Sequence, residues 1–158
     1  MFAIRLINLV ESQAERLSEG LLQKLRNTEQ CRELVRGVPG EELKRRTYEI
    51  YHNLNEWLLT KTESEIEERY VGLGIRRARQ GVPFSAFLWA VSVTKEHLWE
   101  FMQQEGLLEK PLELFGELHL AHSMERFFDR LLYSASIGYE SVRKEESDGT
   151  LRPHAVAR

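Results

Sequence analysis

The chain has 158 residues, of which 42% are hydrophobic and 30% charged, and its formal net charge is −3. This size suits one domain that buries roughly 70% of its unfolded surface, and the negative charge gives no general attraction to nucleic acid or to an anionic membrane. No apolar run approaches the roughly 18 to 20 residues that span a bilayer. The single cysteine, Cys31, excludes an internal disulfide and is typical of a reducing compartment, so we expect a cytoplasmic protein.

Apolar residues recur with helical spacing along most of the chain, and no segment shows the alternation of a strand. Intervals of three and four predict a first helix over residues 2–25, followed by a short helical piece at 31–35. The clearest amphipathic helix spans residues 43–58, with charged side chains opposite its apolar face. Thr62 and Glu65 have the spacing of a capping box, which predicts the start of a fourth helix.

The fourth predicted helix ends at a junction rich in arginine. Arg76, Arg77 and Arg79 fall in its last turn, where cations complement the exposed carbonyl dipoles. Gly81 can adopt the left-handed conformation that closes such a turn, and Pro83 suits the first position of the next helix. The fifth helix then runs to about residue 104. The three tryptophans are predicted to be core side chains: Trp57, Trp89 and Trp99.

The last predicted helix begins near Pro111 and runs to about Lys144, which is unusually long. Its apolar residues cover about half of its circumference, more than a surface helix normally buries. One face can serve the domain's own core and the other a partner, although a central helix packed on both sides within one monomer gives the same pattern. We favour the first reading, in which the homodimer interface consists of Leu120, Met124, Phe127 and Leu131.

Residues 145–158 are polar, include Gly149 and Pro153, and show no periodicity. We therefore predict a disordered tail after a helical domain formed by residues 1–144. Helices joined by short turns, with no strands, predict an all-α fold of about five to six helices with a long C-terminal helix.

Histidines are the candidate ligands for a metal or a haem. His119 and His122 fall on a polar face, and the Glu49–His52 spacing of di-iron bundles occurs only once. His97 projects from a second apolar face of the fifth helix and is the candidate axial ligand if haem binds. A lone histidine on an apolar face is more often a hydrogen-bonded core residue. We therefore predict no cofactor and no metal, with a haem- or metal-binding sensor as the alternative.

Residues 76–91 have the outline of a helix-turn-helix. A recognition helix presents polar side chains to base edges, whereas this one would present Phe84, Phe87, Leu88 and Trp89, so no nucleic-acid partner is expected. The serines and Cys31 lack the sequence context of an activated nucleophile, and no glycine-rich phosphate loop is present. We predict that the protein is not an enzyme.

Three sequence patterns carry a resemblance to a known family. They are Arg77-Ala-Arg-Gln-Gly-Val-Pro83 before an apolar helix with two tryptophans, Tyr51-His-Asn-Leu-Asn-Glu-Trp-Leu-Leu59, and Arg126-Phe-Phe-Asp-Arg130 followed by Gly138-Tyr-Glu140. Together they resemble the N-terminal sensor domains of the RsbR family, regulatory subunits of bacterial stress-signalling complexes, over about residues 5–143.

The resemblance implies a globin-like helical domain that has lost haem and forms a dimer through its terminal helices. In the family this domain senses or docks an input and relays it to a C-terminal domain with phosphorylatable residues. These 158 residues leave no room for such an output domain. We therefore expect a non-catalytic regulatory dimer that acts by associating with protein partners or with an unidentified small ligand.

Overall fold

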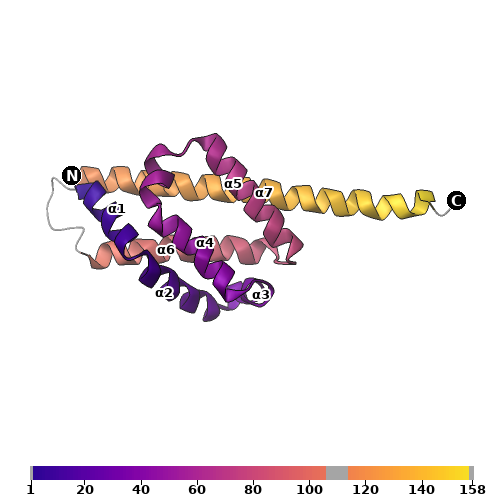
Figure 1. The fold of residues 1–158 in the computed structure, drawn as a ribbon, viewed down its shortest axis with the longest axis horizontal. Helices are drawn as coiled ribbons and strands as arrows, with labels where there is room; N and C mark the ends of the chain where they lie inside the picture. The colour runs from indigo at the N-terminus through magenta and orange to yellow at the C-terminus, as the bar shows by residue number, and fades with distance from the viewer. Residues whose placement is uncertain (1, 106–113, 157–158) are drawn as a thin grey trace.

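The computed structural model describes residues 2–105 and 114–156, and within them every regular element is helical (Figure 1). The prediction of an all-α fold with a long C-terminal helix is thereby confirmed. The elements are α1 (Phe2–Ser12), α2 (Ala14–Arg26), the 3₁₀ turn η1 (Glu29–Cys31), α3 (Arg32–Gly37), α4 (Gly40–His52), the π-helical turn η2 (Glu56–Thr60), α5 (Glu63–Arg79), α6 (Phe84–Gln104) and α7 (Leu114–Val156).

Two helices predicted as continuous are each divided in the structure. The first breaks at Gln13, which separates α1 from α2. The amphipathic helix over 43–58 ends as α4 at His52, and η2 follows after a turn. There the Asn53 side chain donates to the Glu49 carbonyl oxygen at 3.0 Å. Such side-chain bonds compete with the backbone ladder, which apolar periodicity does not detect.

The α5–α6 junction has the predicted local geometry. Thr62 and Glu65 form the capping box that starts α5. Gly81 has a φ of +76°, and the Val82 amide donates to the Arg77 carbonyl at 3.1 Å, closing the helix as a Schellman motif. Pro83 is the N-cap of α6, one position before the helical residue predicted for it.

The long helix α7 lies against the other helices along its first half and projects beyond them at its C-terminal end (Figure 1). Its closest neighbour is α5. A Cβ atom on Gly74 of α5 would lie 2.2 Å from the Ala135 carbonyl oxygen, and one on Gly138 of α7 would lie 2.3 Å from the Val71 carbonyl oxygen. Only glycine allows the two backbones to approach this closely.

The last helix extends past residue 144, where the predicted domain ends. The helix α7 continues through residue 145 to Val156, and Glu145 pairs with Arg79 of α5 at 3.4 Å. Residues 143–146 are Arg-Lys-Glu-Glu, which are good helix formers whose intrahelical hydrogen bonds need no apolar partner. The predicted boundary at 144 relied on the loss of apolar periodicity, and a helix that leaves the domain body loses that signal too.

The three tryptophans predicted to be core side chains differ in burial. Trp57 and Trp99 are partly buried and pack against the core. Trp89 is 47% exposed, so its assignment to the core is wrong. It lies on the outer side of α6 together with Ser85 and Ser92, which are also exposed, while Ala86 and Ala90 face inward. The sequence did not distinguish this outer face, because Trp89 stands within a continuous run of hydrophobic residues, 86–91.

Candidate functional site

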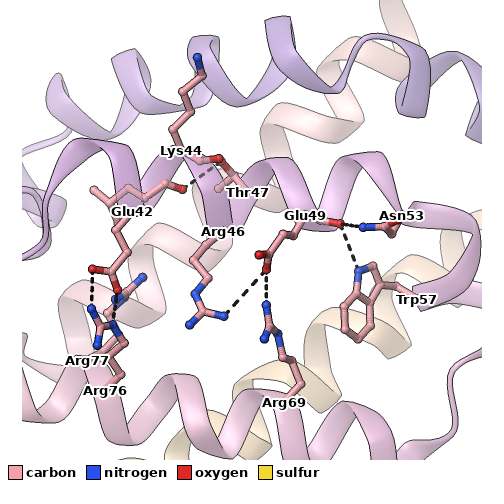
Figure 2. Close-up of polar contacts among 11 residues, drawn as sticks. Glu42, Lys44, Arg46, Thr47, Glu49, Asn53, Trp57, Arg69, Arg76 and Arg77 are labelled. Carbon is pink, nitrogen blue, oxygen red and sulfur yellow. Dashed lines mark hydrogen bonds and ion pairs between the residues drawn. The ribbon is translucent and has the colours of Figure 1, made fainter.

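A buried carboxylate joins the start of α4 to the end of α5. Glu42 is only 6% exposed (Figure 2). Its two oxygens accept hydrogen bonds from three side chains, two of them on α5 and the third on the residue that follows α5. Arg77 Nη1 donates at 2.8 Å, Arg76 donates through both Nε and Nη2, and Gln80 Nε2 donates at 3.2 Å. Sequence analysis assigned these arginines to the helix terminus and missed Glu42, because 34 residues separate it from Arg76.

The electrostatics of this contact favour the ionised carboxylate. The hydrogen bond from Arg76 is the main cause that lowers the Glu42 pKa, from 4.5 to about 2; burial opposes it and Arg77 adds to it. Glu42 also lies in the first turn of α4, whereas both arginines lie in the last turn of α5. Each charge therefore complements the dipole of its own helix as well as its partner.

A second polar group lies two turns further along α4. Glu49 pairs with Arg69 of α5, and Arg46 Nη1 lies 3.9 Å from the same Glu49 oxygen. In Figure 2 the Arg46 side chain lies between those of Glu42 and Glu49 and is directed from α4 toward α5. The Trp57 indole nitrogen donates to the Glu49 carbonyl oxygen at 3.4 Å and so holds η2 against α4.

A cavity of about 60 Å³ lies beside these groups. Its wall is mainly apolar and comes from α2 to α7, with Leu73, Phe87, Val91 and Phe128 among the contributors. The charged side chains in the wall are Arg46 and Arg77. The cavity thus combines an apolar body with guanidinium groups at one side, an arrangement that no sequence motif signals.

Four of the five histidines have side chains that the structure describes. His52, His119 and His122 are exposed, and His97 is half-buried. No group of three or more His, Cys, Asp or Glu side chains with metal-binding geometry occurs among the described residues. The free Cys31 is fully buried.

His97, the candidate haem ligand, is packed between α6 and α2. His97 Nε2 donates to the Leu17 carbonyl oxygen at 3.0 Å, and Gly20 packs so closely that a Cβ there would lie 3.3 Å from the ring. Burial is the main cause that lowers the His97 pKa, which favours the neutral ring. His97 Nε2 is thus bonded within the core, whereas Nδ1 is buried without a hydrogen-bond partner among the described residues.

The stripe predicted as a dimer interface lies in the monomer's own core. Its four side chains are between 0% and 4% exposed: Leu120, Met124, Phe127 and Leu131. The Phe127 ring centroid lies 5.7 Å from that of Trp57 and 5.8 Å from that of Tyr70. This prediction is corrected, because α5 and η2 cover the second apolar face of α7. The alternative weighed in the sequence, a helix packed on both sides within one monomer, describes these residues.

Several large apolar side chains are instead exposed on α6 and α7, and the most exposed near the start of α7 is Leu118, at 58%. Leu88 and Trp89 are 44% and 47% exposed, and Tyr133 is 62% exposed. The two helices are antiparallel neighbours, since the rings of Phe84 and Tyr139 lie 5.1 Å apart and Lys95 pairs with Glu125 at 3.0 Å. This register puts residues 88 and 89 level with Tyr133. We call these three side chains the outer patch.

These features define a class of protein: an all-helical domain with a charged inter-helix contact, a small cavity and an exposed apolar patch. The chain belongs to the family described as the RsbT co-antagonist protein rsbRD N-terminal domain, whose model matches residues 15–152. The resemblance drawn from the sequence is therefore confirmed, and the domain is a regulatory domain of stress signalling. No curated protein and no solved structure matches the chain significantly. Among the described residues, no helix is long and apolar enough to cross a membrane.

Proposed function

We propose that the chain is a non-catalytic, non-haem, globin-like regulatory domain that acts in the bacterial cytoplasm as a homodimer associated with other signalling proteins. Membership of the family supports the regulatory role. The bonded Nε2 of His97 supports the non-haem assignment. The observation that carries the dimer is the outer patch, because large exposed apolar side chains on two adjacent helices are typical of protein interfaces.

The occupant of the outer patch is a second copy of this chain. Arg126, Tyr133 and Glu140 recur every seven residues along α7, and all three are exposed. A two-fold axis through Tyr133 that pairs two antiparallel α7 helices places Arg126 of each copy opposite Glu140 of the other. Such self-complementarity is what an isologous interface requires. Within its own chain Arg126 also donates to Glu63 of α5 at 2.7 Å, so the contact across the axis would share this guanidinium. Ser85 and Ser92, exposed beside Trp89, leave room for a partner helix to approach α6.

Light scattering coupled to size exclusion tests this proposal. The wild type is expected to run as a dimer and Tyr133→Asp as a folded monomer, because the substitution forces an unpaired carboxylate into a dry interface. The matched control is Leu59→Asp, which charges another exposed apolar residue, 52% exposed, on η2. It is expected to remain dimeric.

A charge exchange adds a sharper criterion. Arg126→Glu and Glu140→Arg should each weaken the dimer, and the double variant should restore it. A monomeric wild type rules out the homodimer. A dimer that persists in Tyr133→Asp shows that the interface lies elsewhere.

A further inference from the structure

One polar group in the cavity wall has no partner. Arg46 lines the cavity, and its Nε–H is buried without a hydrogen-bond acceptor among the described residues. A buried donor left unpaired costs about 1–3 kcal/mol, and such groups are rare in native proteins. An acceptor supplied by a bound molecule would remove this cost.

The charges around Arg46 indicate what kind of acceptor fits. Two carboxylates, Glu42 and Glu49, are shared among four guanidinium groups: those of Arg46, Arg69, Arg76 and Arg77. Water reaches the side chains of Arg69 and Arg76, which are 40% and 53% exposed. Those of Arg46 and Arg77 are 25% and 3% exposed, and both face the cavity. Among the described residues that line the cavity there are thus two guanidinium groups and no carboxylate.

The remaining polar groups of the wall do not supply donors. Thr94 Oγ1 donates to the Ala90 carbonyl at 2.7 Å, and Thr47 Oγ1 donates to backbone carbonyls of α4 at 3.0 and 3.1 Å. Arg77 is held by Glu42 and Gln80. Arg46 is thus the group in the wall that has a free N–H and only a distant counter-ion at 3.9 Å.

We propose that this cavity binds a small monocarboxylate, whose carboxylate accepts a hydrogen bond from Arg46 Nε while its apolar body fills the space lined by Phe87, Val91 and Phe128. The volume of about 60 Å³ holds about four to six water-sized groups. The body therefore has about three or four carbon atoms. A guanidinium paired with a carboxylate forms a strong, charge-assisted hydrogen bond, and the apolar wall selects the body. This site goes beyond the proposed function and does not depend on it.

The experiment is an NMR titration of the ¹⁵N-labelled protein with butyrate, 1-butanol and acetate. Butyrate should give saturable shifts at the amides of Arg46, Thr47, Ala90 and Thr94. Acetate lacks the apolar body and 1-butanol lacks the charge, so both should bind at least tenfold more weakly.

Three variants locate the site. Arg46→Gln should weaken butyrate binding about tenfold, whereas Arg45→Gln, which changes the exposed neighbour on the same helix, should leave it unchanged. Ala90→Val adds two methyl groups inside the cavity and should abolish binding in a folded protein. If Arg46→Gln fails to fold, Ala90→Val and the comparison of the three ligands decide.

Several results would overturn the proposal. These are equal binding of butyrate and 1-butanol, equal binding of butyrate and acetate, unchanged butyrate affinity in folded Arg46→Gln, and retained binding in Ala90→Val. The absence of saturable shifts at millimolar butyrate would overturn it as well. None of these results bears on the dimer, which is measured without ligand.

Discussion

Gly74 of α5 and Gly138 of α7 lie against each other where the two helices cross, and each occupies a position that no other residue can take. A Cβ on Gly138 would lie 3.0 Å from the Gly74 carbonyl carbon and 2.7 Å from the Ile75 amide nitrogen. The crossing sets the separation of α5 and α7. It thereby also sets how α7 meets the core and where its outer face lies beside α6.

Replacing Gly74 by alanine should destabilise the domain strongly. The new Cβ would lie 2.2 Å from the Ala135 carbonyl oxygen, a backbone atom that cannot move without separating the helices. We expect the free energy of unfolding to fall by about 3 kcal/mol or more in urea denaturation.

The matched control is Gly72→Ala, two residues before Gly74 on α5, where a Cβ would have no heavy atom within 4 Å. Alanine is the better helix former, so this variant should gain about 0.5–1 kcal/mol. Equal effects of the two substitutions would show that the crossing is looser than described.

Glu42→Gln should cost about 3 kcal/mol of stability, because it leaves the buried guanidinium of Arg77 without its counter-charge. Glu41 is its exposed neighbour on α4, and Glu41→Gln should change stability by no more than about 0.5 kcal/mol. Denaturant unfolding of both variants at neutral pH measures the difference. A loss in Glu42→Gln no larger than that in Glu41→Gln would mean that the ion pair adds nothing to the fold.

The same carboxylate predicts a stability loss in acid. The pKa of Glu42 is about 2 in the folded protein against 4.5 in a free side chain, so the unfolded state binds the proton more readily. Its contribution is complete above about pH 5 and is lost as the pH falls from there to about 2. Its size is roughly 3 kcal/mol. Unfolding curves of wild type and Glu42→Gln between pH 7 and pH 2 should converge toward the acid limit, and parallel curves would contradict the assignment.

Phe127→Asp should unfold the domain rather than dissociate a dimer. Phe127 is 2% exposed and contacts the rings of Trp57, Tyr70 and Phe128, so a carboxylate there is buried without a partner. Circular dichroism should show loss of helix for Phe127→Asp, while Tyr133→Asp, on the opposite side of α7, keeps the helical spectrum. A folded, monomeric Phe127→Asp would restore the interface first predicted from the sequence.

The local rules of helix formation made part of this structure predictable. Thr62 and Glu65 mark the start of α5, and Gly81 and Pro83 mark the turn into α6, because capping and turn geometry depend on residues within a few positions of one another. The resemblance to the regulatory family was also visible in short patterns, and the family model confirms it.

The tertiary structure decided which faces are inside. The sequence showed two apolar faces on α7 but not which of them its own chain covers. The face that includes Phe127 is covered within the monomer, because Tyr70 and Trp57 pack on it. The same holds for Trp89, which an apolar run assigned to the core and the structure exposes. Periodicity reports how apolar a face is, whereas burial depends on what packs against it.

The candidate site could not be predicted from the sequence for a related reason. Glu42 contacts Arg77, 35 positions away in the chain, and the cavity beside Arg46 is lined by side chains from six helices. The sequence by itself determined the all-helical class, the start of α5, the turn into α6 and the family. Only the tertiary structure brought these charges together, because a contact between distant residues depends on how the helices cross, and that crossing depends on packing at positions such as Gly74 and Gly138.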